Sequence, residues 1–527
     1  MAETALREPR AIVVGAGMGG LVSALLLAQQ GLQVTLLEAA AAPGGKMRQL
    51  DVDGAPIDGG PTVFTMRWVF DELLAQCGSS LESLVAPQPL SVLARHAWAG
   101  TDGVQRLDLH ADLGASVDAI GRFAGAAEAR RYRAFCDESR RVYQQLEGPH
   151  IRSQRPSVPG MVAALGPKGL ATLTRLGPFA TLWTRLGKHF HDPRLRQLFG
   201  RYATYCGASP WLAPATLMLI AHVERSGVWS LRGSMHALPQ ALARLAQARG
   251  AQLQFGCRVA QILVRDGRAC GVRLADGREL PADAVVFNGD ASALGQGLLG
   301  DAVSRAAPAV PPQRRSLSAL TWAVHARTAG FPLTHHNVFF CDDYRAEFDD
   351  VLRHRRLPTQ GTVYVCAQDR DDQAAAPAGR ERLLCLVNAP ADGDTRPFDH
   401  AEIEPCLQRS QDLLLRCGLQ VEPQAPRVVT TPAQFHQLFP GTGGALYGAA
   451  GHGWMALFRR SGSLSRLPGL YLAGGSVHPG PGVPMAAMSG RLAAETVLAH
   501  LASTSRSHRV ATSGGTSTPS ATTAGTA

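Results

Sequence analysis

The feature that most constrains this fold is a glycine-rich turn between a short apolar run and a helix-forming segment. Residues 11–14 read Ala-Ile-Val-Val, and Gly15, Gly17 and Gly20 follow in the spacing Gly-x-Gly-x-x-Gly. An apolar run of this length suits a buried parallel strand. Gly15 permits a tight turn, Gly17 lets the backbone approach a phosphate, and Gly20 lets the following helix pack against the strand. Because a helix N-terminus attracts negative charge, the segment predicts a site for the pyrophosphate of a dinucleotide.

A second predicted strand ends at an acid placed to bind ribose. Residues 33–37 are the strand, and Glu38 follows 18 residues after Gly20, about where dinucleotide-binding folds carry a carboxylate for the ribose hydroxyls. A carboxylate here would repel a 2′-phosphate, so FAD or NAD is favoured over NADP. A glycine turn in an unrelated α/β domain is the alternative.

Further glycine turns favour FAD over NAD. Turns at residues 43–46 and 58–61 follow the acid, and a strand–glycine–helix segment returns at residues 469–485. Glycine lets backbone lie against an extended cofactor, and Lys46 can neutralise phosphate or flavin charge. Ordinary hairpin turns are the alternative for either early turn alone. The residues expected to contact the cofactor here are Gly44, Gly45, Lys46, Gly60, Pro61, Gly474, Gly475, Gly482, Val483 and Met485.

Length and cysteine usage narrow the class of protein. A chain of 527 residues predicts two or three domains. The ten cysteines are scattered without a Cys-x-x-Cys motif, and His335 and His336 have no partner in the sequence, so we expect neither a disulfide framework nor a metal site. A reducing, cytoplasmic environment fits best. The first ten residues are polar and no apolar run reaches the length of a membrane span, so we expect no signal peptide and no transmembrane helix.

The chain has a net charge of +10, and one stretch of it carries cations in a pattern that suggests binding to a membrane surface. No acidic residue lies between Glu147 and Asp192, whereas apolar residues recur there at helical spacing. The cations of this stretch are Arg152, Arg155, Lys168, Arg175, Arg185 and Lys188. This composition is typical of a helix lying in an anionic interface, although a helical hairpin with solvated cations is the alternative. Nucleic-acid binding is not expected, because no basic and aromatic groove motif accompanies the charge.

The order of predicted elements indicates an α/β fold with α+β insertions. We expect a discontinuous Rossmann-like FAD-binding domain, a substrate-binding sheet domain and a helical membrane-associated insertion. Residues 503–527 are Ser, Thr, Gly and Ala with little else and are predicted to be a disordered tail. The expected boundaries are 1–85, 235–300 and 460–502 for the first domain, 86–147, 200–234 and 301–459 for the second, and 148–199 for the insertion.

These motifs together resemble the bacterial-type carotenoid (phytoene) desaturase family, within the superfamily of FAD-containing amine oxidases. The resemblance runs from the first glycine turn to Gly490 and is carried by residues 227–233, 335–340, 342–348 and 478–484. Residues 447–458 look like the branch that acts on hydroxylated acyclic carotenoids. The resemblance implies 3,4-desaturation of a 1-hydroxy carotenoid with FAD, and it places Val259 on the strand beside the adenine, where a plain core valine is the alternative.

The resemblance also implies candidate catalytic residues and partners. Asp137 and Arg140 match a family helix near the expected active cavity, and at i, i+3 they share one helix face; a surface ion pair is the alternative. We expect a carotenoid substrate, oxygen or a membrane quinone as electron acceptor, and a peripheral position on the cytoplasmic side of the inner membrane. The alternatives are a phytoene desaturase, another flavin oxidase of this fold, or a non-catalytic prenyl-binding escort protein.

Overall fold

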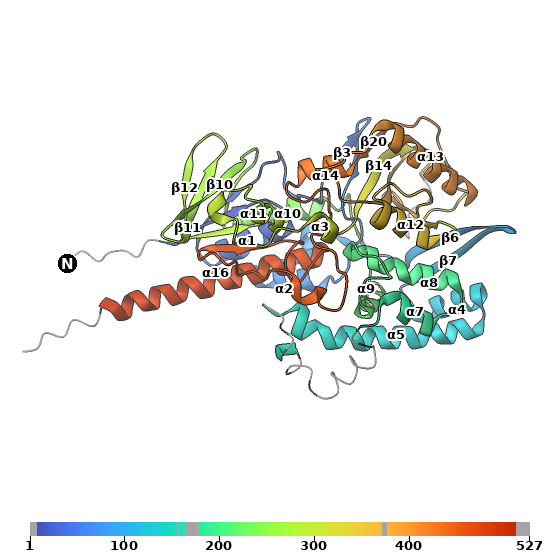
Figure 1. The fold of residues 1–527 in the computed structure, drawn as a ribbon, viewed down its shortest axis with the longest axis horizontal. Helices are drawn as coiled ribbons and strands as arrows, with labels where there is room; N and C mark the ends of the chain where they lie inside the picture. The colour runs from blue at the N-terminus through green and yellow to red at the C-terminus, as the bar shows by residue number, and fades with distance from the viewer. Residues whose placement is uncertain are drawn as a thin grey trace, which may run out of the picture.

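The computed structural model describes residues 8–154, 179–371 and 377–512, with the isolated positions 157, 159–161, 163, 166 and 177. The fold is drawn in Figure 1, and its organising element is a five-stranded parallel sheet in the order β21-β13-β1-β2-β9. The strands come from widely separated parts of the chain. They are β1 (Arg10–Val14), β2 (Gln33–Leu37), β9 (Gln252–Gln254), β13 (Ala284–Phe287) and β21 (Leu470–Leu472).

One face of this sheet is covered by α1 (Met18–Gln29), which is buried over almost its whole length. The helices α10 (Ala237–Ala248) and α16 (Val483–Thr512) pack against it. Burial on several sides explains why α1 is apolar all round instead of amphipathic. On the other face, the antiparallel strands β10 (Val259–Arg265), β11 (Arg268–Leu274) and β12 (Glu279–Pro281) share a core with β13 and β21.

A second sheet of seven strands stands beside the first, in the order β20-β14-β18-β17-β16-β6-β7. All its pairs are antiparallel except β16 with β6. Its strands are β6 (Val92–Gly100), β7 (Gly103–His110), β14 (Ser318–Ala326), β16 (His336–Phe340), β17 (Val363–Ala367), β18 (Glu381–Ala389) and β20 (Arg427–Thr430). Alternate residues face opposite cores, one closed by α13 (His400–Arg416) and the other by a block of helices.

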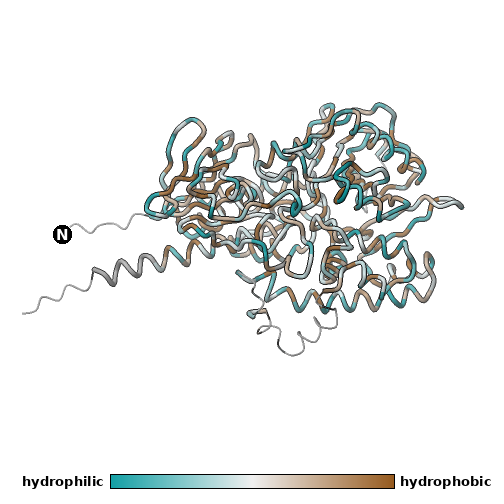
Figure 2. The backbone as a smooth tube through the Cα atoms, viewed as in Figure 1, coloured by the Kyte–Doolittle hydropathy of each residue, from teal (hydrophilic) through white to brown (hydrophobic). Residues whose placement is uncertain are grey.

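The helical block contains α4 (Leu113–Ala124), α5 (Ala126–Leu146), α7 (Leu182–His189) and α8 (Pro193–Gly200). Polar and apolar residues alternate along it in Figure 2, as expected of helices with one buried face. Leu182 and Leu186, which we expected at a membrane interface, are fully buried in the core beneath the second sheet. They cannot face lipid, because that core already covers them. Arg155, Lys168 and Arg175 lie outside the described residues.

Two further features bear on the sequence predictions. The helix α16 continues to Thr512, so it passes residue 503, where we predicted a disordered tail to begin; residues 513–527 lie outside the described part. Over the described residues, none of the helices combines the length and apolar composition that crossing a bilayer requires.

Candidate functional site

The first glycine turn has a geometry that only glycine can adopt. Gly15 has a φ of +101°, and its N–H donates to the Leu37 carbonyl at 2.7 Å, which ties the turn to β2. A Cβ atom on Gly20 would lie 2.0 Å from the Gly15 carbonyl oxygen. The helix α1 therefore meets the turn at backbone contact, with its N-terminus at the carboxyl end of β1, where parallel sheets bind dinucleotides.

Glu38 is held in place at the end of β2 by the backbone. Its Oε2 accepts a hydrogen bond from Ala16 N–H at 2.6 Å and its Oε1 accepts one from Ala40 N–H at 2.8 Å. Each carboxylate oxygen keeps a further acceptor site for a ribose hydroxyl. Cys257 N–H donates to the Glu38 carbonyl at 2.8 Å, so the segment that leads into Val259 at the start of β10 runs beside this acid.

The later glycine turns converge on the first. Gly44 N–H donates to the Ala16 carbonyl at 2.8 Å, and a Cβ on Gly45 would lie 3.2 Å from the Gly17 Cα. A Cβ on Gly60 would lie 1.8 Å from the Lys46 carbonyl oxygen, so this turn, which Pro61 follows, also needs glycine. The glycine turns that the sequence predicted to form one cofactor site therefore contact one another in the fold.

The closing segment completes the cradle from the far end of the chain. Gly474 has a φ of +115°, and its N–H donates to Ser489 Oγ at 3.1 Å. The helix α16 begins at Val483, directly after Gly482 with a φ of +113°. Met485 lies in the first turn of α16, and Gly475 follows Gly474 in the glycine loop. A second helix N-terminus thus joins the strand–turn–helix unit of β1 and α1.

Asn288 is a site residue that sequence reasoning missed. It follows β13, and its side chain is wedged among the turns, so that a Cβ on Gly17, Gly19 or Gly474 would lie 2.7 to 2.8 Å from its amide atoms. Its buried Oδ1 has no hydrogen-bond partner among the described residues. A polar atom left without a partner at the centre of a glycine cradle fits a site that a polar ligand completes. Its position after an apolar strand was the available sequence clue.

Two cations lie at the end of the cradle that faces the second sheet. Lys46 Nζ donates to the Leu446 carbonyl at 2.6 Å and lies 5.4 Å from the Phe439 ring. Burial lowers the pKa of Lys46, and Asp290 opposes that shift. Arg460 donates to the carbonyls of Tyr447 at 3.0 Å and Gly475 at 3.3 Å, so it ties the closing glycine turn to the segment at residues 447–458.

These features fit FAD. The acid Glu38 suits its ribose, the glycine turns and helix N-termini suit its pyrophosphate, and Lys46 with Arg460 supplies positive charge beyond the pyrophosphate, where the flavin half would extend. All the cofactor-contacting residues predicted from sequence belong to this cradle or to the strand beside Glu38.

Asp137 and Arg140 are placed differently. They form an ion pair on α5, with Arg140 Nη2 3.3 Å from Asp137 Oδ1 and with 45% and 49% of the Asp137 and Arg140 side chains exposed. The helix α5 packs mainly against α4 and α9 (Leu219–Arg225). The described contacts therefore give a surface pair and do not bring these two residues to the cradle.

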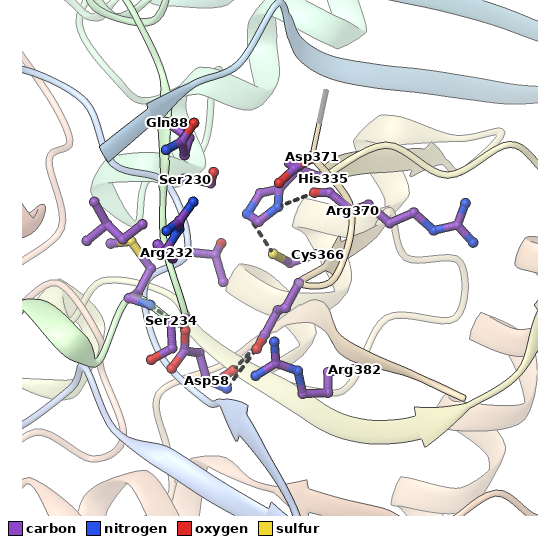
Figure 3. A pocket seen from close by; sticks show the side chains of 15 residues that line it. Asp58, Gln88, Ser230, Arg232, Ser234, His335, Cys366, Arg370, Asp371 and Arg382 are labelled. Carbon is purple, nitrogen blue, oxygen red and sulfur yellow. Dashed lines mark hydrogen bonds between the residues drawn. The ribbon is translucent and has the colours of Figure 1, made fainter. Parts of the chain in front are cut away.

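A polar pocket lies where the second sheet meets the cofactor domain, and Figure 3 shows its lining. His335 Nδ1–H donates to the Arg370 carbonyl at 2.7 Å, and His335 Nε2 lies 3.7 Å from the Cys366 sulfur (Figure 3). The donor atoms of His335, His336 and Cys366 all lie within 4.8 Å of one another, so the fold supplies a thiol neighbour that the sequence did not reveal. Burial raises the pKa of Cys366 to about 12, so the thiol keeps its proton and can donate it to His335. The absence of a metal stays a prediction.

Comparisons with known proteins agree with this geometry. Residues 18–498 match the family described as flavin containing amine oxidoreductase. The chain is 64% identical over 524 residues to a hydroxyneurosporene desaturase of Rubrivivax gelatinosus, with 99% of each chain covered. It is 48% identical to a hydroxyneurosporene desaturase of Cereibacter sphaeroides, over 94% of this chain and 99% of that one. The structure of a cyclohexylamine oxidase of Brevibacterium oxydans superposes with a TM-score of 0.55 at 16% identity, covering 94% of this chain and 100% of that one, and this likeness concerns the fold alone.

Proposed function

The chain belongs to the flavin-containing amine oxidoreductase family, and from that premise we propose that it desaturates the C3–C4 bond of 1-hydroxylated acyclic carotenoids. It is an FAD-dependent oxidoreductase. The observation that carries the substrate class is the 64% identity to a hydroxyneurosporene desaturase across 99% of both chains. A phytoene desaturase, another flavin oxidase or a prenyl-binding escort protein is not favoured by these relatives.

The reaction depends mainly on how well this chain aligns the substrate with the flavin. Bound FAD supplies a two-electron acceptor strong enough to take a hydride from a saturated carbon. Glu38 and the glycine turns would hold the cofactor, and the reacting carbons of the long hydrocarbon must lie against its flavin. The second hydrogen leaves as a proton, and the resemblance leaves Asp137 with Arg140 as candidates to assist it.

Membrane attachment is part of the proposal, at a site other than the buried face of α7. Phe179, Leu212 and Trp454 are large apolar side chains that are 76%, 48% and 43% exposed. They are neighbours, because the rings of Phe179 and Trp454 lie 5.8 Å apart and Gly453 N–H donates to the Leu212 carbonyl at 2.9 Å. An exposed apolar group of this kind suits insertion into the interface of a bilayer. We propose a peripheral enzyme on the cytoplasmic side of the inner membrane, with oxygen or a membrane quinone reoxidising the flavin.

The test is to incubate the flavin-loaded protein with liposomes that carry hydroxyneurosporene, neurosporene or phytoene. We expect the hydroxylated carotenoid to lose two hydrogens, seen by mass spectrometry and as a red-shifted absorption, and phytoene to remain unchanged. Efficient conversion of phytoene would refute the substrate class. Comparing anaerobic turnover with and without a soluble quinone then identifies the acceptor.

A further inference from the structure

A buried polar cluster interrupts the apolar core between the cofactor cradle and the second sheet. It is centred on η2 (Arg201–Cys206), where Arg201 Nη1 donates to the Tyr205 hydroxyl at 3.0 Å. On the neighbouring helix α9, Glu224 Oε2 accepts a hydrogen bond from the Tyr202 hydroxyl at 2.7 Å. The Arg201 guanidinium carbon lies 5.3 Å from the centre of the Tyr364 ring on β17. A charged cluster here needs a reason, because burying charge is costly.

Arg201 keeps hydrogen-bonding capacity that its surroundings leave unused. Burial disfavours its charge, but Tyr205, Tyr364 and Glu224 outweigh burial and raise the pKa of Arg201, so it is a cation. A guanidinium group has five N–H donors; within the described part of the chain, the hydrogen bond found for Arg201 goes to Tyr205. Arg201 and Tyr205 keep accessible surface, whereas Tyr202 is 4% exposed. Arg201 therefore keeps donors for a further partner, next to a Tyr205 hydroxyl that accepts from Arg201, hydrogen-bonds Glu224 and keeps a second lone pair.

This cluster adjoins the flavin end of the cradle. Gly207, which directly follows η2, has a φ of +64°, and a Cβ there would lie 2.4 Å from the Tyr447 ring. The Tyr447 carbonyl accepts a hydrogen bond from Arg460, which also binds the Gly475 carbonyl. Two packed residues thus separate η2 from the closing glycine turn.

The proposed reaction requires a polar group close to the bond that is oxidised. The hydroxyl oxygen is on C1, and only two carbon–carbon bonds separate C1 from the reacting C3, so the hydroxyl must enter the interior together with the reacting carbons. A buried hydroxyl without a partner is costly. We infer that Arg201 and Tyr205 form the subsite that receives the tertiary hydroxyl of the substrate, with Arg201 donating to its oxygen and Tyr205 accepting its proton in a hydrogen bond. This inference rests on the proposed function and names the residues that give it specificity.

The test compares binding of two carotenoids that differ only at C1 and C2, where one carries the elements of water and the other a double bond. Hydroxyneurosporene and neurosporene in liposomes are titrated against the flavin-loaded protein, and binding is followed by quenching of tryptophan fluorescence. We expect Arg201→Met to weaken binding of the hydroxylated carotenoid about ten- to hundred-fold, since it removes a charged donor, while binding of neurosporene stays within about two-fold. Tyr205→Phe, which keeps the charge of Arg201 next to Glu224, should weaken the same carotenoid by about ten-fold.

Tyr202→Phe is the matched control, because it removes from the same helical turn a hydroxyl that also bonds Glu224 but belongs to a buried side chain. It should leave the ratio of the two affinities unchanged even where both affinities fall. If Arg201→Met and Tyr205→Phe bind both carotenoids with the wild-type ratio, the subsite is refuted. If the wild-type protein converts neither carotenoid, the proposed reaction fails, but the affinity ratios still decide whether Arg201 and Tyr205 recognise the hydroxyl.

Discussion

Replacing Gly20 by alanine tests whether the first glycine turn is built for a cofactor. Alanine in a helix is ordinarily favoured over glycine by about 1 kcal/mol. At position 20, however, the added Cβ would lie 2.0 Å from the Gly15 carbonyl oxygen and 2.9 Å from Asn288 Oδ1. Contacts below 3.0 Å force a shift, so the turn and α1 must separate by roughly 1 Å. Overpacking of this kind costs about 1–3 kcal/mol, which cancels or exceeds the propensity gain.

The effect on FAD should be larger than the effect on folding. A shift of about 1 Å removes or weakens hydrogen bonds from the turn to the pyrophosphate, and each charge-assisted bond contributes about 1.5–3 kcal/mol. We therefore expect Gly20→Ala to bind FAD at least about ten-fold more weakly. Gly121→Ala is the matched control, because Gly121 is also helical but an added Cβ there meets nothing closer than Ala129 Cβ at 3.7 Å. It should bind FAD normally and unfold at a slightly higher temperature.

The assay measures bound flavin by absorbance after dialysis, the FAD dissociation constant by titration of the stripped protein, and the thermal midpoint of each variant. The reasoning fails if Gly20→Ala retains wild-type FAD affinity and gains the same stability as Gly121→Ala. That outcome would mean that the close approach of α1 to the turn carries no constraint.

Three further predictions concern other parts of the molecule. Replacing Phe179 and Trp454 by serine should lower the fraction of protein that floats with anionic liposomes by at least about three-fold without changing the thermal midpoint, and unchanged flotation would remove this site from the membrane proposal. Asp137→Asn should change the free energy of unfolding by less than about 0.5 kcal/mol, as expected for an exposed ion pair. If kcat falls about 100-fold while the flavin stays bound, Asp137 takes part in proton transfer. If kcat is unchanged, Asp137 and Arg140 are only a surface ion pair. Burial lowers the pKa of His478 to about 4, so the folded state favours the neutral imidazole. The free energy of unfolding is therefore at its full value above the ordinary pKa of 6.5, and it decreases by about 3 kcal/mol as the pH falls toward 4. Urea unfolding at pH 7 and pH 4.5 should therefore show a smaller pH effect in His478→Gln than in wild type, and equal effects would contradict this reasoning.

The cofactor domain was predictable because its information is local. The predicted strand at residues 11–14 lies within β1, and the one at residues 33–37 coincides with β2, since apolar runs and glycine turns consist of consecutive residues. The strands β6 and β7 were not anticipated. The strand β6 is parallel to β16, more than two hundred residues later, and such pairing depends on distant partners that no local pattern specifies.

The same difference between local and distant information separates the site residues that were predicted from those that were missed. Glycines with special backbone geometry were found from sequence, because the requirement for glycine is itself local. Asn288 was missed because its role depends on two glycine turns, at residues 15–20 and at Gly474, meeting around it. Arg201 was missed for a similar reason, since its importance depends on burial and on a glutamate in another helix. For α7, helical spacing of leucines indicated a buried face correctly but could not distinguish lipid from the protein core as the partner.

The discontinuous parallel sheet has a consequence for how the protein is made. The strand β21 and the helix α16 leave the ribosome long after β1 and α1, yet β21 completes one edge of the sheet and α16 covers α1. Until they emerge, the nascent chain carries an unpaired β13 edge and an uncovered apolar helix, both of which invite aggregation. FAD cannot find its complete cradle during most of synthesis, because Gly474 and Gly482 are not yet present. We expect productive folding to require chaperone protection of the growing chain, and cofactor loading to be among the last steps in its maturation.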